Sequence, residues 1–285
     1  MSARAIAESL YAHGVIDNPL QFRYLVWRTQ SERRLQPGRY RFPLNSGERA
    51  VLAALTREGP AFLMVTIPEG FTMSQIAAVL DENGICKARD FLAVCQDTAL
   101  LHKLGINFPS AEGFLFPESY EFMTGTRPAD VVARLVAQFW SVYEQLDSAA
   151  QRPGPEVAQA VILASLVEKE AKLPGERPII AGVFRNRLRR HLPLQSCATV
   201  EYILPEHKEV LSYQDLKTPS PYNTYLHSGL PPGPICNPGR AALAAALNPA
   251  RTGYFFFVAR GDGSHIFSVT PAEHEAALRR VRSLN

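Results

Sequence analysis

Apolar positions in the first third of the chain recur with helical spacing in two similar segments. Residues 6–15 place Ile6, Ala7 and Leu10 ahead of a glycine, and residues 76–85 repeat this pattern. A phenylalanine follows each copy, at Phe22 and Phe91. We expect each copy to form an amphipathic helix with a glycine C-cap, then a turn and a second helix.

Two segments between and beside these helices have the composition of strands. Residues 38–42 and 62–67 alternate or run apolar with aromatic and β-branched residues, which predicts extended structure. We therefore expect residues 1–98 to form a small α+β domain and residues 99–285 to form a second domain. Residues 112–120 are dense in aromatic residues and broken by a proline, which indicates a packed connection.

Within the second domain, a helix is predicted over residues 127–146, and its apolar positions form one stripe. The next helix starts near Pro155 and is apolar on nearly all sides from Val157 to Val167, as helices at the centre of a domain are. It ends in Glu168, Lys169 and Glu170. A third helix is predicted over residues 176–190.

The last hundred residues predict a long loop followed by regular elements. Residues 218–239 are rich in proline, and embedded tyrosines and aliphatic residues indicate an ordered, packed loop. Residues 254–258 and 265–268 predict a hairpin, and Thr270 with Glu273 predicts a capping box on a final helix. The fold class is therefore α+β, with a mixed helical and β second domain that carries a glutamate at the end of a buried helix.

Composition narrows the class of protein. The 285 residues are 46% hydrophobic and 20% charged, with a net charge of +3, which excludes a disordered or fibrous chain and disfavours a nucleic-acid binder. No apolar run reaches the ~18 residues of a membrane-spanning helix. The four cysteines lack zinc-ligand spacing and are expected to be small buried hydrophobes, and we expect no metal or cofactor.

The sharpest candidate for chemistry is the Glu168-Lys169-Glu170 sequence. Residues two apart on a helix point about 200° away from each other, so the two carboxylates cannot share one site. Glu170 continues the stripe of Leu163 and Leu166, where partial desolvation raises the pKa of a carboxyl group, as a general acid for glycosidic cleavage requires. The alternative is a solvated helix end, and Glu168 is expected to support the site or the structure.

Several motifs, in order along nearly the whole chain, resemble the YceG-like family of bacterial endolytic murein transglycosylases. They are residues 37–42, 112–117, 164–170, 176–178, 181–188, 194–196, 218–225, 229–239 and 263–268.

The resemblance implies cleavage of the β-1,4 bond between N-acetylmuramic acid and N-acetylglucosamine in peptidoglycan, without water, leaving 1,6-anhydromuramic ends. It maps the catalytic glutamate onto Glu170 and implies a LysM-like N-terminal domain. It also implies a role in terminating nascent glycan strands, with peptidoglycan synthases as possible partners. One N-terminal inner-membrane anchor and action on the extracytoplasmic face are implied too. Because the chain starts directly at the first repeat helix, we expect a truncated chain or a late start codon.

One carboxyl group suffices for this reaction, because the C6 hydroxyl of the substrate replaces water as the nucleophile, whereas hydrolases usually need two. Two alternatives stay open. The first is a hydrolytic muramidase that uses Glu168 or Asp215 as a second carboxylate; Glu201, which like Asp215 lies in a polar stretch, is a further candidate. The second is a catalytically silent glycan-binding or scaffold protein.

Uncharged hydrogen-bonding and aromatic groups downstream are candidates for sugar recognition. With Glu168, the candidate substrate-binding residues are Gln195, Ser196, Thr199, Tyr222, Asn223 and Tyr225. For the loop residues the alternative is packing of the loop on itself. Where many relatives have an acidic residue and a proline, this chain has Cys197 and Ala198.

Two further groups are expected to have structural or solvent-exposed roles. His265 is expected to be a structural hydrogen bonder. The basic cluster at the end of the third helix is expected to be a solvated face, with carboxylates of peptidoglycan stem peptides as an alternative partner. The cluster consists of Arg185, Arg187, Arg189 and Arg190.

Overall fold

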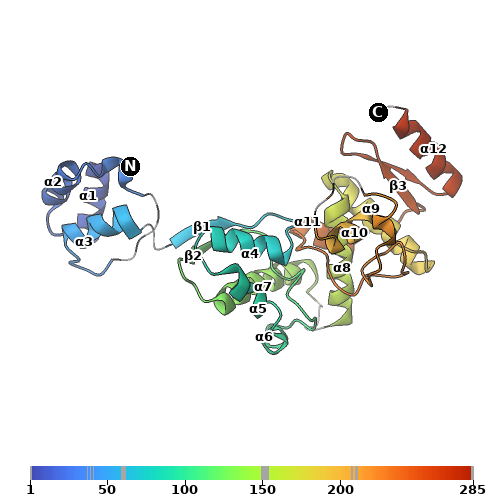
Figure 1. Ribbon diagram of the computed structural model, residues 1–285, viewed down its shortest axis with the longest axis horizontal. Coiled ribbons are helices and arrows are strands. Elements are labelled where there is room, and N and C mark those ends of the chain that lie inside the picture. The colour runs from blue at the N-terminus through green and yellow to red at the C-terminus, as the bar shows by residue number, and fades with distance from the viewer. Residues whose placement is uncertain are drawn as a thin grey trace. The chain divides into compact units, whose positions relative to one another are not determined.

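The computed structural model describes residues 2–36, 38, 40, 42–58, 62–148, 154–206, 208 and 211–283. The chain forms two compact units, which are described separately (Figure 1). The first comprises Met1–Val65, Glu82–Ile85 and Tyr120–Thr126, and the second comprises the rest. Within the described residues, no helix is both long enough and apolar enough to cross a bilayer.

The first unit is a small helical core with a two-stranded sheet. Helices α1 (Ala3–Ala12), α2 (Pro19–Arg28) and α3 (Glu48–Ala53) bury Ala7, Phe22 and Val51 completely. Short 3₁₀ and π turns follow at Glu32–Arg34 and Ala54–Glu58. Strand β1 (Phe62–Thr66) pairs with β2 (Ser119–Met123).

The second unit begins with the second copy of the repeat. Helices α4 (Met73–Glu82) and α5 (Ala88–Val94) are followed by α6 (Thr98–Lys103) and the long α7 (Pro128–Leu146). An aromatic cluster fixes α7, because Phe114 packs edge-on against Phe139 at 4.9 Å between ring centroids. The aromatic density of residues 112–120 thus serves the core, and the predicted packed connection leads into β2.

The rest of the second unit is built around α8 (Pro155–Glu170), from which every residue between Val161 and Val167 is buried. Helix α11 (Arg240–Leu247), whose buried residues are mostly alanines, packs on it, and α9 (Arg177–Arg189) lies alongside after a 3₁₀ turn at Pro174–Glu176. Helix α10 (Cys197–Ile203) and a 3₁₀ turn at Asp215–Lys217 precede the long loop. Strands β3 (Phe256–Ala259) and β4 (His265–Ser268) form an antiparallel hairpin on which α12 (Pro271–Arg282) packs.

Most predicted elements are confirmed. The repeat appears as α1–α2 and α4–α5, with Gly14 and Gly84 both at positive φ after the first helix of each copy. The helices predicted over residues 127–146 and 176–190, the hairpin and the capping box are also present. The mixed α+β class is confirmed, whereas the functional boundary at residues 98 and 99 stays a prediction.

The prediction of a strand over residues 38–42 is wrong for the residues that the structure describes. Arg39 and Arg41 lie outside the described residues, and Gly38, Tyr40 and Phe42 are not in a strand. The Tyr40 and Phe42 rings stack on each other at 5.7 Å and pack against the helical core of the first unit. Packing on helices, rather than pairing with a strand, satisfies their apolar side chains.

Candidate active site

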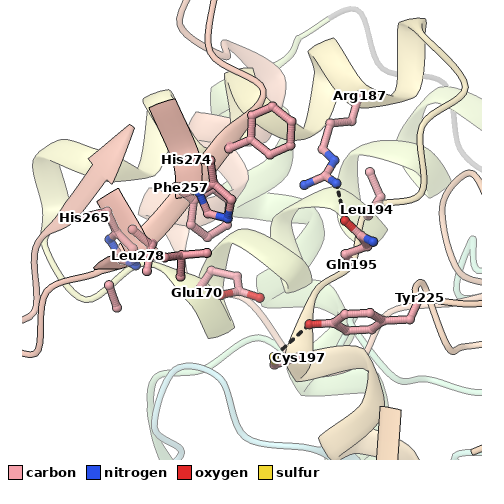
Figure 2. A pocket seen from close by; sticks show the side chains of 13 residues that line it. Glu170, Arg187, Leu194, Gln195, Cys197, Tyr225, Phe257, His265, His274 and Leu278 are labelled. Atoms are coloured by element: carbon pink, nitrogen blue, oxygen red, sulfur yellow. Dashed lines mark hydrogen bonds between the residues drawn. The ribbon is translucent and has the colours of Figure 1, made fainter. Parts of the chain in front are cut away.

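Glu170 lines a cavity of 450 Å³, and its carboxyl group faces into that cavity (Figure 2). Glu170 is the last residue of α8, so a buried helix delivers its side chain to the cavity wall. The other walls come from α9, residues 194–197, the loop at Tyr225, the β3–β4 hairpin and α12. Among the described residues that line the cavity, Glu170 is the sole carboxylate.

A hydroxyl network holds this carboxylate in place. The Ser196 hydroxyl donates a hydrogen bond to Glu170 Oε1 at 2.5 Å. Ser196 is held in turn, because its backbone N–H donates to Thr224 Oγ1 and its carbonyl accepts from Thr199 Oγ1. Ser196 and Thr199 are buried, so their described contacts position the carboxylate from behind the cavity surface.

The surroundings of Glu170 favour its protonated form. Burial raises the pKa of Glu170 above its ordinary value, and the charge of Glu201 adds to this rise. The hydrogen bond from Ser196 and the proximity of His265 offset part of it. A larger fraction of Glu170 is therefore protonated near neutral pH than for an exposed glutamate, which suits a general acid.

His265 forms the cavity wall and is fixed by a second carboxylate. Its Nδ1 lies 2.6 Å from Glu176 Oε2, and its backbone N–H donates to Glu176 Oε1 at 3.0 Å. The expectation of a structural hydrogen bonder matches these contacts. The imidazole also faces the cavity that contains Glu170, which the sequence did not indicate.

The opposite wall carries Gln195, Arg187 and Tyr225. Gln195 has a φ of 52°, a left-handed conformation that non-glycine residues seldom adopt. Its Oε1 accepts a hydrogen bond from Arg187 Nη2 at 2.5 Å (Figure 2). The Tyr225 hydroxyl lies 3.1 Å from Cys197 Sγ. Cys95 and Cys236 are buried as expected for the cysteines, whereas Cys86 is half-buried and Cys197 is exposed; all four are free thiols.

The other predicted sugar contacts lie away from the cavity. Tyr222 packs on Tyr202 with ring centroids 5.3 Å apart. Asn223 is fully buried, and its amide nitrogen donates to the Leu216 and Thr218 carbonyls, so its described contacts hold the loop together. Their assignment to substrate binding stays a prediction.

Glu168 points to a different part of the second unit. Its Oε1 lies 3.5 Å from Arg177 Nη2, and its Oε2 accepts a hydrogen bond from the Gly239 N–H at 2.9 Å. The side chain is 7% exposed, so it is a buried ion-pair partner. The separation of Glu168 from Glu170, argued from helical geometry, agrees with these contacts.

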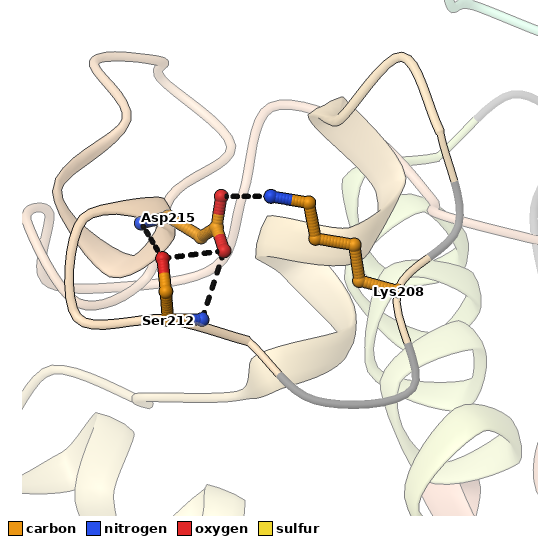
Figure 3. Close-up of polar contacts among 3 residues, drawn as sticks. All are labelled: Lys208, Ser212 and Asp215. Atoms are coloured by element: carbon orange, nitrogen blue, oxygen red, sulfur yellow. Dashed lines mark hydrogen bonds and ion pairs between the residues drawn. The ribbon is translucent and has the colours of Figure 1, made fainter.

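Asp215, the alternative second carboxylate, is hydrogen-bonded to residues of its own loop (Figure 3). It accepts hydrogen bonds from Lys208 Nζ at 2.7 Å and from the Ser212 hydroxyl and N–H at 2.7 and 2.8 Å. These contacts, led by Lys208, lower the pKa of Asp215 to about 2. A carboxylate so firmly ionised and engaged is poorly suited to accept a proton near neutral pH.

In the described part of the chain, no group of three or more His, Cys, Asp or Glu side chains is placed to hold a metal ion. One carboxyl group of raised pKa, that of Glu170, faces the cavity and accepts a hydrogen bond from the Ser196 hydroxyl, an arrangement that suits general acid–base chemistry.

Comparison with known proteins identifies the family to which the chain belongs. The profile of the YceG-like family matches residues 1–280, so the chain belongs to this family. The endolytic murein transglycosylase of Bacillus subtilis (strain 168) is 32% identical, over 99% of this chain and 82% of the relative. That of Streptococcus pneumoniae (strain D39) is 28% identical over 90% of this chain, which spans about half (52%) of the relative. The 2.6 Å crystal structure of a yceG-like protein from Listeria monocytogenes is also similar, with a TM-score of 0.68 and 29% identity over 97% of this chain and 95% of that one.

Proposed function

We propose that this chain is an endolytic murein transglycosylase with Glu170 as its single catalytic acid and base. The observation that carries the proposal is that Glu170 is the sole carboxylate among the described residues lining its cavity. The names of the relatives in Bacillus and Streptococcus support the same activity.

The proposed reaction needs one proton carrier. Protonated Glu170 donates its proton to the bridging oxygen between N-acetylmuramic acid and N-acetylglucosamine, and the C1–O bond breaks. The resulting carboxylate then accepts the proton of the C6 hydroxyl, whose oxygen bonds to C1 and closes the 1,6-anhydro ring. Glu170 returns to its protonated form and water is not consumed, so no second carboxylate is required.

The raised pKa of Glu170 and its contact with Ser196 serve both steps. Burial keeps the proton available for the first step, and the Ser196 hydroxyl stabilises the carboxylate formed between the steps. We propose that Gln195 and Tyr225, which line the same cavity, contact the sugar through the amide and the aromatic face.

The products of digestion test the reaction. Purified chain is incubated with peptidoglycan strands, and the released fragments are identified by mass. We expect internal cleavage and fragments that end in anhydromuramic acid, one water lighter than hydrolysis products. Reducing ends would support the hydrolytic muramidase instead, and an absence of fragments together with glycan binding would support the scaffold.

We also propose a cellular setting from the family resemblance. Residues 1–98 would act as a LysM-like glycan-binding domain, and the enzyme would work at the extracytoplasmic face of the inner membrane. There it would terminate nascent strands beside peptidoglycan synthases. The support is the match to the YceG-like family over residues 1–280.

A further inference from the structure

Arg187 is a buried cation, and none of the ion pairs among the described residues joins it to a carboxylate. It lies in the last turns of α9 and is 9% exposed, although the sequence predicts that the arginine cluster to which it belongs is a solvated face. Burial lowers the pKa of its guanidinium below the ordinary value, yet an arginine stays charged at neutral pH. Buried charges in proteins are usually paired, because removal from water is costly.

The contacts that Arg187 makes with described residues are to neutral groups. The guanidinium carbon lies 5.4 Å from the centre of the Phe256 ring, and Nη2 donates to the neutral Gln195 side chain. Its buried Nε has no hydrogen-bond partner among the described residues. The hydrogen bonds and ion pairs of the described residues give it no acidic partner either.

The guanidinium of Arg187 borders the cavity that contains Glu170 (Figure 2). Arg187 and Gln195 line the same cavity as Glu170, and Figure 2 shows the guanidinium and the amide directed toward each other at one wall. An arginine presents a rigid fork of donors that matches the two oxygens of a carboxylate. Phe256 and Gln195 hold that fork in place before any ligand arrives.

We propose that Arg187, oriented by Gln195 and Phe256, binds a carboxylate of the glycan substrate beside Glu170. This inference rests on the proposed function. Two substrate groups carry this chemistry: the carboxylates of the stem peptide, and the lactyl carboxylate of a muramic acid that has lost its peptide. Either would place an anion on Arg187 and so fix the register of the strand over Glu170.

The test compares three substrates and three variants. The substrates are peptide-bearing strands, strands stripped of peptide by an amidase, and peptide-bearing strands whose carboxyl groups have been converted to methylamides. The variants are Arg187→Met, Arg187→Lys and the matched control Arg185→Met, which removes a charge from an exposed position on the same helix. Initial rates of chain scission give kcat and KM separately.

We expect Arg187→Met to raise KM about 10- to 100-fold on the strand that carries the recognised carboxylate, as for loss of a hydrogen-bonded charge. On methylamidated strands it should change KM less than about twofold, because no ion pair is left to lose. Arg187→Lys keeps the charge but loses the fork, so its effect should be intermediate. Arg185→Met should behave as the parent chain.

The pattern identifies the source or overturns the proposal. A loss confined to peptide-bearing strands assigns a stem-peptide carboxylate, and one confined to stripped strands assigns the lactyl group. Equal losses on all three substrates overturn the carboxylate site. If Arg187→Met does not fold, as judged by thermal unfolding, Arg187→Lys decides by the same comparison.

Failure of the proposed function would be visible separately. The parent chain would then release no anhydro ends from any strand. Sedimentation of the Glu170→Gln chain with the three strand preparations, with and without Arg187→Met, still measures carboxylate recognition. Tighter binding of a carboxylate-bearing strand that Arg187→Met abolishes supports the site, and indifference to Arg187→Met overturns it.

Discussion

Replacement of Glu168 by alanine tests whether the first glutamate of the pair is structural. Glu168 is 7% exposed and pairs with Arg177, which is 13% exposed. The change leaves the guanidinium without this partner and the Gly239 N–H without its acceptor. We therefore expect a loss of stability rather than a loss of chemistry.

The magnitude follows from burial and from what remains nearby. Removal of one partner from a buried ion pair typically costs about 3–5 kcal/mol in the free energy of unfolding. Glu69 feels the charges of both Glu168 and Arg177, so it can replace part of the lost interaction. We expect a cost near the lower end, about 3 kcal/mol, which corresponds to a fall in Tm of about 6–12 °C for a unit of this size.

The assay measures thermal unfolding together with the rate and products of glycan cleavage below the transition. Glu156→Gln is the matched control, because it removes a carboxylate from an exposed position on the same helix and should leave Tm nearly unchanged. A Glu168→Ala chain that keeps its Tm but loses cleavage would refute the structural role. It would return Glu168 to the catalytic machinery.

Three further results are expected. Ser196→Ala removes a hydrogen bond that lowers the pKa of Glu170, so the alkaline limb of the rate–pH profile should move to higher pH; an unmoved or lowered limb contradicts this. Burial raises the pKa of Glu112 to about 7, so protonation of Glu112 stabilises the folded chain. Stability should fall by about 3 kcal/mol as pH rises from below 4.5 to above 7, and Tm measurements should show less of this fall in Glu112→Gln. A methyl group at Gly182 would collide with the backbone carbonyl of Ala250, so Gly182→Ala should cost about 1–3 kcal/mol in denaturant unfolding, and an unchanged midpoint would contradict the close packing.

Local signals were sufficient to predict α8 and its burial, whereas the assignment of a catalytic role to Glu170 came from the family resemblance. A helix with apolar residues on all sides is expected to be buried, and this expectation needs no knowledge of the rest of the fold. The structure buries residues 161–167 of α8. The glycine C-caps of the repeat and the capping box at Thr270 are local in the same way. Such features depend on neighbours a few residues apart, which the sequence displays directly.

The partners of Glu170 depend on contacts that no local pattern encodes. Ser196 reaches it because α10 begins at the next residue and Gln195 adopts a positive φ. Arg187 is buried because Phe256, distant in sequence, covers its guanidinium. The aromatic and amide residues of the loop suited sugar recognition by type, yet the structure uses Asn223 for internal hydrogen bonds of the loop.

Replacement of Glu170 by glutamine tests the central claim most directly. The amide keeps the size of the side chain but can neither donate the carboxyl proton nor accept the C6 hydroxyl proton. We expect release of anhydro-ended fragments, identified by mass, to fall by about 10²- to 10⁴-fold, while thermal unfolding and glycan binding are retained. Release of the same fragments at the parental rate by a folded Glu170→Gln chain would contradict the assignment of Glu170 as the catalytic acid and base.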